Sequence, residues 1–313
     1  MIPRQHTVET PYMVGPVHCY SSVRDGELIL FDTGPPTDTG RAFLQRTLDL
    51  TQLRHVLVTH CHIDHYGQSA WLVANTDAEL YLPYRDVLKI RHHQERMQLM
   101  YELLTGLGFG SQYLNQLRRV FDRGVLFPPF PERYRVAETE LPTRLGITAL
   151  PCPGHSQSDL VYHGDDWAIT GDTMLRGIFQ SPLLDIDTET GVRFNNYRAY
   201  CSSIVNLAGL RDKRILPGHR MFIDRVDDTL CFYLSKLLQR VHQVRPHLGR
   251  STVAEVIDRV FVDMKDPFHV FLKASEILFM KDLLEDPQPL REALEQTGLF
   301  ARVEEAYHQV AVR

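Results

Sequence analysis

The chain has 313 residues, of which 43% are hydrophobic, 23% charged and 10% aromatic. This composition is typical of a globular protein and excludes a disordered or fibrous one. The 34 Lys and Arg residues face 39 Asp and Glu residues, so the formal net charge of −5 gives no overall field that would hold the chain on nucleic acid or on an anionic membrane.

The first residues and the cysteines of the chain bear on its expected location. The first 15 residues lack the apolar run after a basic start that a signal peptide needs. No stretch approaches the roughly 18 apolar residues of a membrane span. The five cysteines are odd in number and contain no CxxC pair, which favours reduced thiols over a disulfide framework or a thiolate zinc site. We therefore expect a cytoplasmic protein that does not enter a membrane.

Alternating strands and helices are predicted for residues 27–82. Short apolar runs at 27–31 and 55–59 each lead into a polar segment, which indicates buried strands. Apolar residues at helical spacing predict a helix at 39–50, and residues 68–74 predict a second helix before a third strand at 78–82. The order in this part of the chain is therefore strand, helix, strand, helix, strand.

Strands return later in the chain. Short apolar runs at 147–151, 160–163 and 167–170 predict a meander with tight turns. A helix at 197–210 precedes a late strand at 214–216. Strands in both halves of the chain, with helices between them, predict an α/β layered sandwich.

Two helical segments interrupt this alternation. Residues 85–123 carry an apolar stripe at helical spacing, with a glycine-rich break at 106–110. From about residue 227 the chain is almost wholly helical, and a Thr252-x-x-Glu255 capping box opens one of these helices. We expect a catalytic domain at 1–226 that contains a helical insertion at about 85–123, followed by a C-terminal helical appendix at 227–313.

A dense cluster of metal-ligating side chains follows the strand predicted at 55–59. The segment His60-Cys61-His62-Ile63-Asp64-His65 places three imidazoles and a carboxylate within six residues. These are ligands of borderline and hard divalent cations, and only a cation would offset the free energy of desolvating them together. The cluster predicts a metal site at the carboxyl end of this strand.

Three further segments have the same layout, in which a short strand runs into a loop with one potential ligand. In two of them a Pro-Gly pair directly precedes a histidine, which predicts a tight turn that aims the ring across the strand ends. The candidate ligands are five histidines and two aspartates, namely His60, His62, Asp64, His65, His155, Asp172 and His219.

These motifs resemble those of the metallo-β-lactamase superfamily of metallohydrolases. The matching residues, in the order of that family, are Asp32-Thr33-Gly34, the cluster from His60 to His65, Pro153-Gly154-His155, Gly171-Asp172 and Pro217-Gly218-His219. The resemblance covers about residues 12–225 and implies an αββα sandwich with the metals at one edge of its two sheets. The C-terminal helices resemble the helical or winged-helix appendix of one branch.

The resemblance also implies how the ligands divide between two adjacent divalent ions, zinc in the first place, with iron or manganese as alternatives. One ion would have the ligands His60, His62 and His155, the other Asp64, His65 and His219, and Asp172 would bridge them. A hydroxide that bridges the metals would attack an ester, thioester or lactone. Asp64 and Asp172 are the expected catalytic carboxylates, and Asp64 or a metal-bound water would handle the proton.

The segment 85–123 suggests the substrate. It lies between the ligand segments ending at His65 and His155, so both of its ends must start near the metal edge. We expect a lid whose Met97 and Met100 line the site and select a small molecule with an apolar acyl or aromatic group. Tyr66-Gly67-Gln68 replaces the paired glycine of the glyoxalase-II-like branch, which argues against a glutathione thioester.

Two other functions stay open at this point. A metal-dependent nuclease acting on RNA would use the basic excess of segment 85–123, seven Lys or Arg against four Asp or Glu. This excess is slight, and the chain lacks the extra specificity domain of the RNA-processing branch, so the nuclease ranks second and nucleic acid is not the expected partner. A metal-bound regulator with vestigial activity is the third candidate, against which the complete ligand set argues. The sequence does not identify the substrate or the metal, and it does not show whether the C-terminal helices touch the substrate. It also leaves the oligomeric state open, and a homodimer is one possibility.

Overall fold

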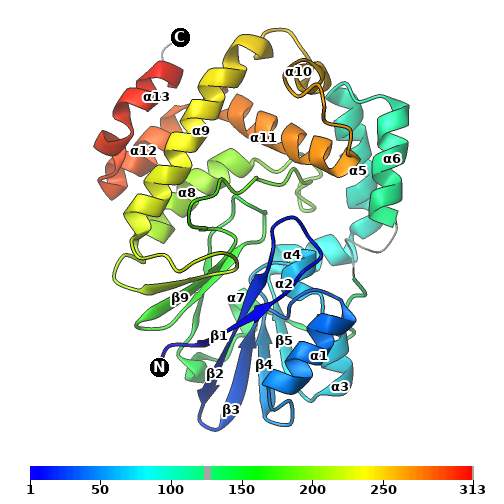
Figure 1. The fold of residues 1–313 in the computed structure, drawn as a ribbon, viewed down its shortest axis with the longest axis vertical. Helices are drawn as coiled ribbons and strands as arrows, with labels where there is room; N and C mark the ends of the chain where they lie inside the picture. Colours follow the sequence, from blue (N-terminus) through cyan, green and yellow to red (C-terminus); the bar gives the residue numbers. More distant parts are fainter. Residues whose placement is uncertain (123–127, 312–313) are drawn as a thin grey trace.

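Two β-sheets pack face to face in the computed structural model, which describes residues 1–122 and 128–311 (Figure 1). The larger sheet has six strands in chain order, with β1 to β3 antiparallel and β3 to β6 parallel. Its strands are β1 (Arg4–Val8), β2 (Val17–Arg24), β3 (Glu27–Phe31), β4 (Leu53–Leu57), β5 (Glu79–Leu82) and β6 (Arg135–Val136).

The smaller sheet has four strands in the order β10-β9-β8-β7. The pair β10 and β9 is parallel, and the other pairs are antiparallel. Its strands are β7 (Thr148–Pro151), β8 (Leu160–His163), β9 (Trp167–Gly171) and β10 (Arg214–Pro217). The carboxyl ends of β4, β7, β9 and β10 lead into the loops that hold the candidate ligands.

The alternation of side chains along β3 explains the layers. Ile29 and Phe31 point into the space between the two sheets, where the Phe31 ring meets the Trp167 ring at 5.4 Å between centroids. Leu28 and Leu30 point to the opposite face. Since successive side chains of a strand point to opposite faces, an unbroken apolar run gives a strand that is buried on both sides.

Helices cover both outer faces of the sandwich. Leu44 of α1 (Asp38–Thr47) and Leu72 of α3 (Ser69–Asn75) pack on the outer face of the larger sheet. Ile204 of α8 (Asn196–Ala208) belongs to the apolar cluster that includes Val161 and Ala168 of the smaller sheet. The αββα sandwich expected from the sequence is confirmed.

The longer helices of the insertion and of the C-terminal part form a layer above the sheets in the view of Figure 1. The insertion contributes α4 (Tyr84–Arg91), α5 (His93–Gly106) and α6 (Ser111–Asp122). The C-terminal part contributes α9 (Val226–Leu248), α10 (Val253–Val260), α11 (Pro267–Glu285), α12 (Gln288–Thr297) and α13 (Glu304–Ala311). Short helical turns lie at α2 (Ile63–Tyr66), α7 (Ala137–Glu140), Thr143–Leu145 and Phe300–Arg302. The capping box predicted at Thr252 and Glu255 opens α10, so the C-terminal helical appendix is confirmed as helical.

The apolar stripe of the insertion packs against the C-terminal helices. Met100 and Leu104 are buried in the same apolar cluster as the core residues of α9, α10 and α11. The hydroxyl of Tyr113 donates to the carbonyl of Pro267 at 3.0 Å. Met100 is buried in this cluster, which corrects the expectation that it lines the metal edge, and Met97 is partly buried against the same cluster.

The proposed boundaries within the chain stay predictions. These are a catalytic domain at 1–226, a lid at about 85–123 and an appendix at 227–313. Residue 123 of the lid and residues 312–313 of the appendix lie outside the described residues. Among the helices that the structure describes, none is both long and apolar enough to cross a membrane.

Candidate metal centre

The seven candidate ligands lie in loops at the carboxyl ends of strands from both sheets. The cluster from His60 to His65 follows β4, and His155 follows β7. Asp172 follows β9 directly, and His219 follows β10 after one glycine. Because the two sheets present these strand ends at one edge of the sandwich, ligands that are far apart in the sequence come together.

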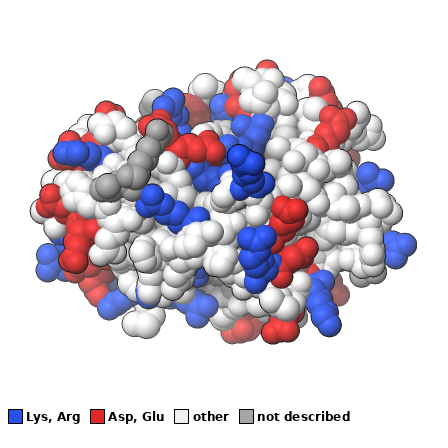
Figure 2. All heavy atoms as spheres, turned by 90° about the horizontal axis from the view of Figure 1, so that it is seen from above, with Lys and Arg blue, Asp and Glu red and all other residues white. Residues whose placement is uncertain are grey.

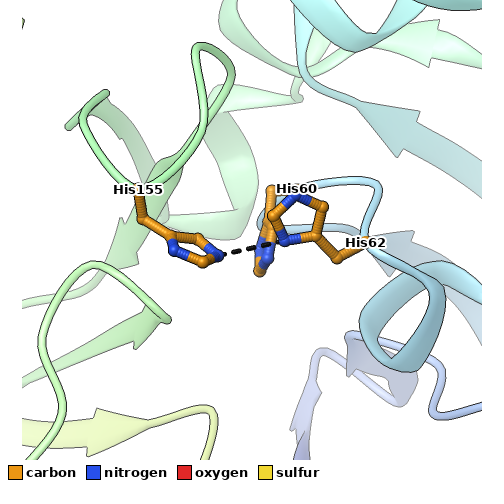
Figure 3. Close-up of side chains that lie close together, drawn as sticks. All are labelled: His60, His62 and His155. Atoms are coloured by element: carbon orange, nitrogen blue, oxygen red, sulfur yellow. Dashed lines mark hydrogen bonds between the residues drawn. The ribbon is translucent and has the colours of Figure 1, made fainter. Parts of the chain in front are cut away.

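Three histidines form the first group of possible metal ligands. One ring nitrogen each from His60, His62 and His155 lies within 4.8 Å of the others. Figure 3 shows the rings converging from two loops, with His155 Nε2 at 3.0 Å from His62 Nδ1. These are the three side chains that the family resemblance assigns to one ion.

A second group has one carboxylate and two imidazoles. Ligand atoms of Asp64, His65 and His219 also lie within 4.8 Å of one another, and all three residues are buried. His219 Nε2 lies 3.3 Å from Asp64 Oδ2. These are the side chains that the resemblance assigns to the other ion.

Asp172 contacts histidines of both groups. Its Oδ1 lies 3.4 Å from His65 Nε2 and 3.6 Å from His219 Nε2. Its Oδ2 lies 3.7 Å from His155 Nε2. A single carboxylate therefore faces both groups, which is the position that a bridging ligand requires. The individual ligand roles stay predictions.

Four buried atoms at this centre lack a hydrogen-bond partner among the described residues. They are His60 Nε2, His65 Nε2, His219 Nε2 and Asp172 Oδ1. A buried polar atom without a partner costs about 1–3 kcal/mol. Four such atoms in one place fit a group that satisfies them together, and nitrogen and oxygen donors fit a divalent cation such as zinc.

The charges of these side chains are set by burial and by each other. Burial and the neighbouring His65 and His62 hold the pKa of His60 well below its usual value. Burial opposes ionisation of Asp172, yet His219 and His65 hold the pKa of this carboxyl well below its usual value. At pH 7 His60 is therefore neutral and Asp172 ionised, which are the protonation states in which these groups bind metals.

His65 has the opposite shift. Burial lowers the pKa of His65, but the carboxylates of Asp172, Asp32 and Asp64 outweigh burial and raise this pKa well above its usual value. In the chain without metal these acidic side chains therefore attract a proton to the imidazole. A cation at the same place satisfies the same carboxylates, so proton and metal compete for this position.

The second nitrogen of four candidate histidines is held from outside the centre. Each partner can accept a hydrogen bond from Nδ1, which leaves Nε2 of these rings facing the centre. The contacts are His60 Nδ1 to Thr59 Oγ1 at 3.0 Å, His65 Nδ1 to Asp32 Oδ2 at 2.8 Å, His155 Nδ1 to the Ser181 carbonyl at 2.8 Å and His219 Nδ1 to the Pro16 carbonyl at 2.7 Å.

Asp32, the first residue of the Asp32-Thr33-Gly34 motif, is a positioning residue, a role that the sequence alone did not predict. Its backbone has φ +56°, a conformation that asparagine and aspartate tolerate better than most residues. Its carboxylate accepts the backbone N–H of Thr59 at 2.7 Å, the Thr59 hydroxyl at 2.9 Å and the N–H of His65. It thereby fixes both the loop before His60 and the ring of His65.

We expect Asp32→Asn to weaken metal binding by about 10- to 100-fold, the usual effect of losing an outer partner of a ligand. The asparagine amide can still accept from Thr59, but its nitrogen cannot accept the N–H of His65. Chelator competition on the whole chain measures the change. Asp25→Asn is the matched control, because Asp25 also has a positive φ, of +51°, but lies in an exposed turn. Equal affinities in the two variants would contradict the role given to Asp32.

The inserted helix α4 also reaches the ligand cluster. The buried carboxylate of Asp86 accepts the backbone N–H of Cys61 at 2.7 Å, between His60 and His62. Burial and then the charge of Asp86 raise the pKa of the Cys61 thiol well above its usual value. The thiol is therefore protonated, and no cysteine belongs to a candidate metal group among the described residues. Sequence reasoning missed Asp86, because nothing local marks it as a partner of Cys61.

Comparison with known proteins identifies the family. The model of the metallo-beta-lactamase superfamily matches residues 12–219. A metallo-beta-lactamase family protein from Thermus thermophilus is similar in structure, with a TM-score of 0.71 and 20% identity over 91% of this chain and 94% of that one. A beta-lactamase domain protein from Burkholderia ambifaria has a TM-score of 0.71 and 20% identity over 91% and 87% of the two chains. These two structural similarities support the fold alone. The chain belongs to the metallo-beta-lactamase superfamily of metal-dependent hydrolases.

Proposed function

We propose that this protein is a dinuclear metal-dependent hydrolase that cleaves an ester, thioester or lactone of a small apolar acyl or aromatic substrate. The observation that carries the proposal is the position of Asp172, whose carboxylate faces histidines of both ligand groups. A site for a single metal ion needs only one set of ligands and no carboxylate between two sets.

The two groups of side chains at the centre supply the ligands of two metal ions. When bound, two divalent ions supply a Lewis acid and water acidified to near neutral pH. Zinc suits the nitrogen and oxygen donors, as do iron and manganese. In this proposal one ion is held by His60, His62 and His155, the other by Asp64, His65 and His219, and both by Asp172.

Asp64 is the residue that we assign to the proton. Burial raises the pKa of this carboxyl, but His65 and His219 outweigh burial and lower it. Asp64 is therefore ionised at neutral pH, and its side chain lies at the centre with 10% of its surface exposed. An ionised carboxylate at this position can take a proton from water and return it to the leaving group.

The loop between β1 and β2 supports an apolar substrate. In Figure 1 it rises between the sheets and the C-terminal helices. It carries Tyr12 and Met13, and the Met13 sulfur contacts His269 Nε2 of α11 at 2.7 Å. The same loop reaches the candidate ligands, because the Pro16 carbonyl accepts the N–H of His219 Nδ1 at 2.7 Å. Burial, and then the charge of Asp64, raise the pKa of Tyr12 to about 12. The aromatic and apolar side chains of this loop favour an apolar acyl or aromatic group.

A nuclease is less favoured, because basic residues of the insertion are already paired. Arg85 contacts Asp187 at 3.0 Å, and Arg96 contacts Asp185 at 2.5 Å. On the face seen in Figure 2, Lys and Arg lie interspersed with Asp and Glu, without a continuous basic track. A protein that follows a phosphate backbone needs such a track.

The test is a metal analysis combined with a substrate panel. We expect about two equivalents of zinc, iron or manganese per chain under metal-replete conditions. We also expect turnover of an ester, thioester or lactone in a panel that includes phosphodiesters and single-stranded RNA. One retained equivalent would refute the dinuclear site. Turnover of RNA with a steep salt dependence, and of no acyl compound, would establish the nuclease instead.

A further inference from the structure

The C-terminal helix α11 contains a buried carboxylate that has no part in the proposed reaction. Glu276 is 5% exposed and has three donors. Its Oε1 accepts the Ser181 hydroxyl at 2.6 Å, and its Oε2 accepts from Arg240 Nη1 at 2.8 Å and from Lys273 Nζ at 2.9 Å. Because two cations compensate the buried charge, the carboxylate is held in one place.

Ser181 joins this carboxylate to the metal centre. The carbonyl of the same residue accepts the N–H of His155 Nδ1 at 2.8 Å. The backbone N–H of Leu183 donates to the carbonyl of His155 at 2.7 Å, so the segment and the ligand are connected twice. Ser181 therefore lies between a metal-facing ring and a helix almost one hundred residues later in the chain.

Helix α11 holds this segment at a second point. The hydroxyl of Ser275, the residue before Glu276, accepts the backbone N–H of Leu184 at 3.0 Å. Two successive side chains of one helix thus fix the backbone on both sides of residues 182 and 183. A carbonyl held in this way has little freedom to move away from the ring that it orients.

We propose that Glu276 is a positioning residue for the metal ligand His155, and that it acts through Ser181. In consequence, the C-terminal helices set the metal affinity of the three-histidine group in addition to covering the core. This inference rests on the proposed function, because it takes His155 to bind a metal. Outer partners of metal-binding histidines fix the orientation of the ring, and their loss weakens binding.

Ser181→Ala is the decisive variant. It removes the hydroxyl that reaches Glu276 but keeps the carbonyl that faces His155, and it leaves Glu276 paired with two cations. We expect one of the two zinc ions to bind about tenfold more weakly, in competition with a chromophoric chelator. The affected ion is the one that His155→Ala also weakens, and the other ion binds as before. Ser181→Thr keeps the hydroxyl and is expected to restore the affinity.

A matched control separates this effect from a general loss of helix packing. Asp282 lies on the same helix, is 7% exposed and is paired with Arg193 at 2.8 and 2.6 Å. Asp282→Asn disturbs an equally buried ion pair outside the contacts that lead to His155, so zinc affinity should not change.

The outcomes distinguish this inference from the proposed function. If Ser181→Ala binds both ions as Asp282→Asn does, while His155→Ala loses one, the role of Glu276 is wrong and the metal site stands. If His155→Ala also keeps both ions, the proposed ligand set is wrong, and the inference is wrong with it.

Discussion

Asp172→Ala is expected to bind no more than one metal ion and to lose hydrolysis by at least about a hundredfold in kcat/KM, the scale for removing one group that stabilises a transition state. The reason is that this one carboxylate faces the histidines of both ligand groups. Elemental analysis measures the metal content, and the best acyl substrate of the panel measures the activity. His60→Ala is expected to give a similar loss of activity.

The fold should survive this substitution. Asp172 begins a loop after β9 and is not part of an apolar core cluster, so its removal leaves no cavity there. Far-ultraviolet circular dichroism in the presence of zinc checks this point. Asp166→Ala is the control, because Asp166 lies exposed at the other end of the same strand. An Asp172→Ala protein with two ions and ordinary activity would show that the carboxylate does not bridge.

Strands with continuous apolar runs were predictable from the sequence. The strand predicted at 27–31 is β3 with the same bounds, whereas the strand predicted at 55–59 is β4 at Leu53–Leu57. The difference at its end has a local cause. The backbone N–H of Thr59 donates to the Asp32 carboxylate in place of a neighbouring strand, so regular pairing stops where the ligand loop begins.

The residues of β1 and β2 carry no apolar run that would predict a strand, because most of them are polar. In the fold some of these polar residues are buried, namely His6, His18, Ser21 and Ser22. His6 Nε2 lies 2.7 Å from the Ser21 hydroxyl, and burial lowers the pKa of His6 to about 4, so the ring is neutral. A hydrogen-bonded polar pair can replace an apolar pair in a strand, but the pattern of hydrophobic residues does not reveal it.

The candidate metal ligands could be predicted, because the sequence around each of them marks it. Four ligands share one short segment, and the other three follow short strands, so residue type and spacing were enough. The residues that orient the ligands were not predictable, because each pair joins distant parts of the chain. Asp32 meets His65, Asp86 meets Cys61, and Ser181 meets both His155 and Glu276. The packing of the apolar stripe in segment 85–123 was not predictable either. The spacing of its residues shows that one face of the helices is apolar, but not which part of the chain covers that face.

A large loss of stability is expected when the contact between the insertion and the ligand cluster is broken. Lys89 of α4 forms an ion pair with Asp86 and donates to the Ser158 hydroxyl at 3.2 Å. Its side chain is 13% exposed, and the Asp86 side chain is fully buried. Burial lowers the pKa of Lys89, but Asp86 and Asp185 outweigh burial and raise it. The ammonium group is therefore charged at neutral pH and compensates a carboxylate that has no access to water.

Lys89→Met is expected to destabilise the folded protein by about 3–5 kcal/mol, the usual effect of leaving a buried charge without its partner. The urea midpoint at a fixed zinc concentration measures the loss. The double variant Asp86→Asn with Lys89→Met should lose less than Lys89→Met alone, because it also removes the unpaired charge. Glu295→Gln, which breaks the exposed pair with Arg291, should leave the midpoint unchanged.

The comparison of the single and double variants decides what the insertion does at the ligand cluster. The Asp86 carboxylate also holds the backbone N–H of Cys61 between two candidate ligands, so an Asp86 left without its cation is free to move. Lys89→Met should then weaken zinc binding as well as the fold, and the double variant should recover stability without recovering zinc affinity. If Lys89→Met behaves like Glu295→Gln in both measurements, the ion pair is solvated, and α4 does not support the loop from His60 to His62.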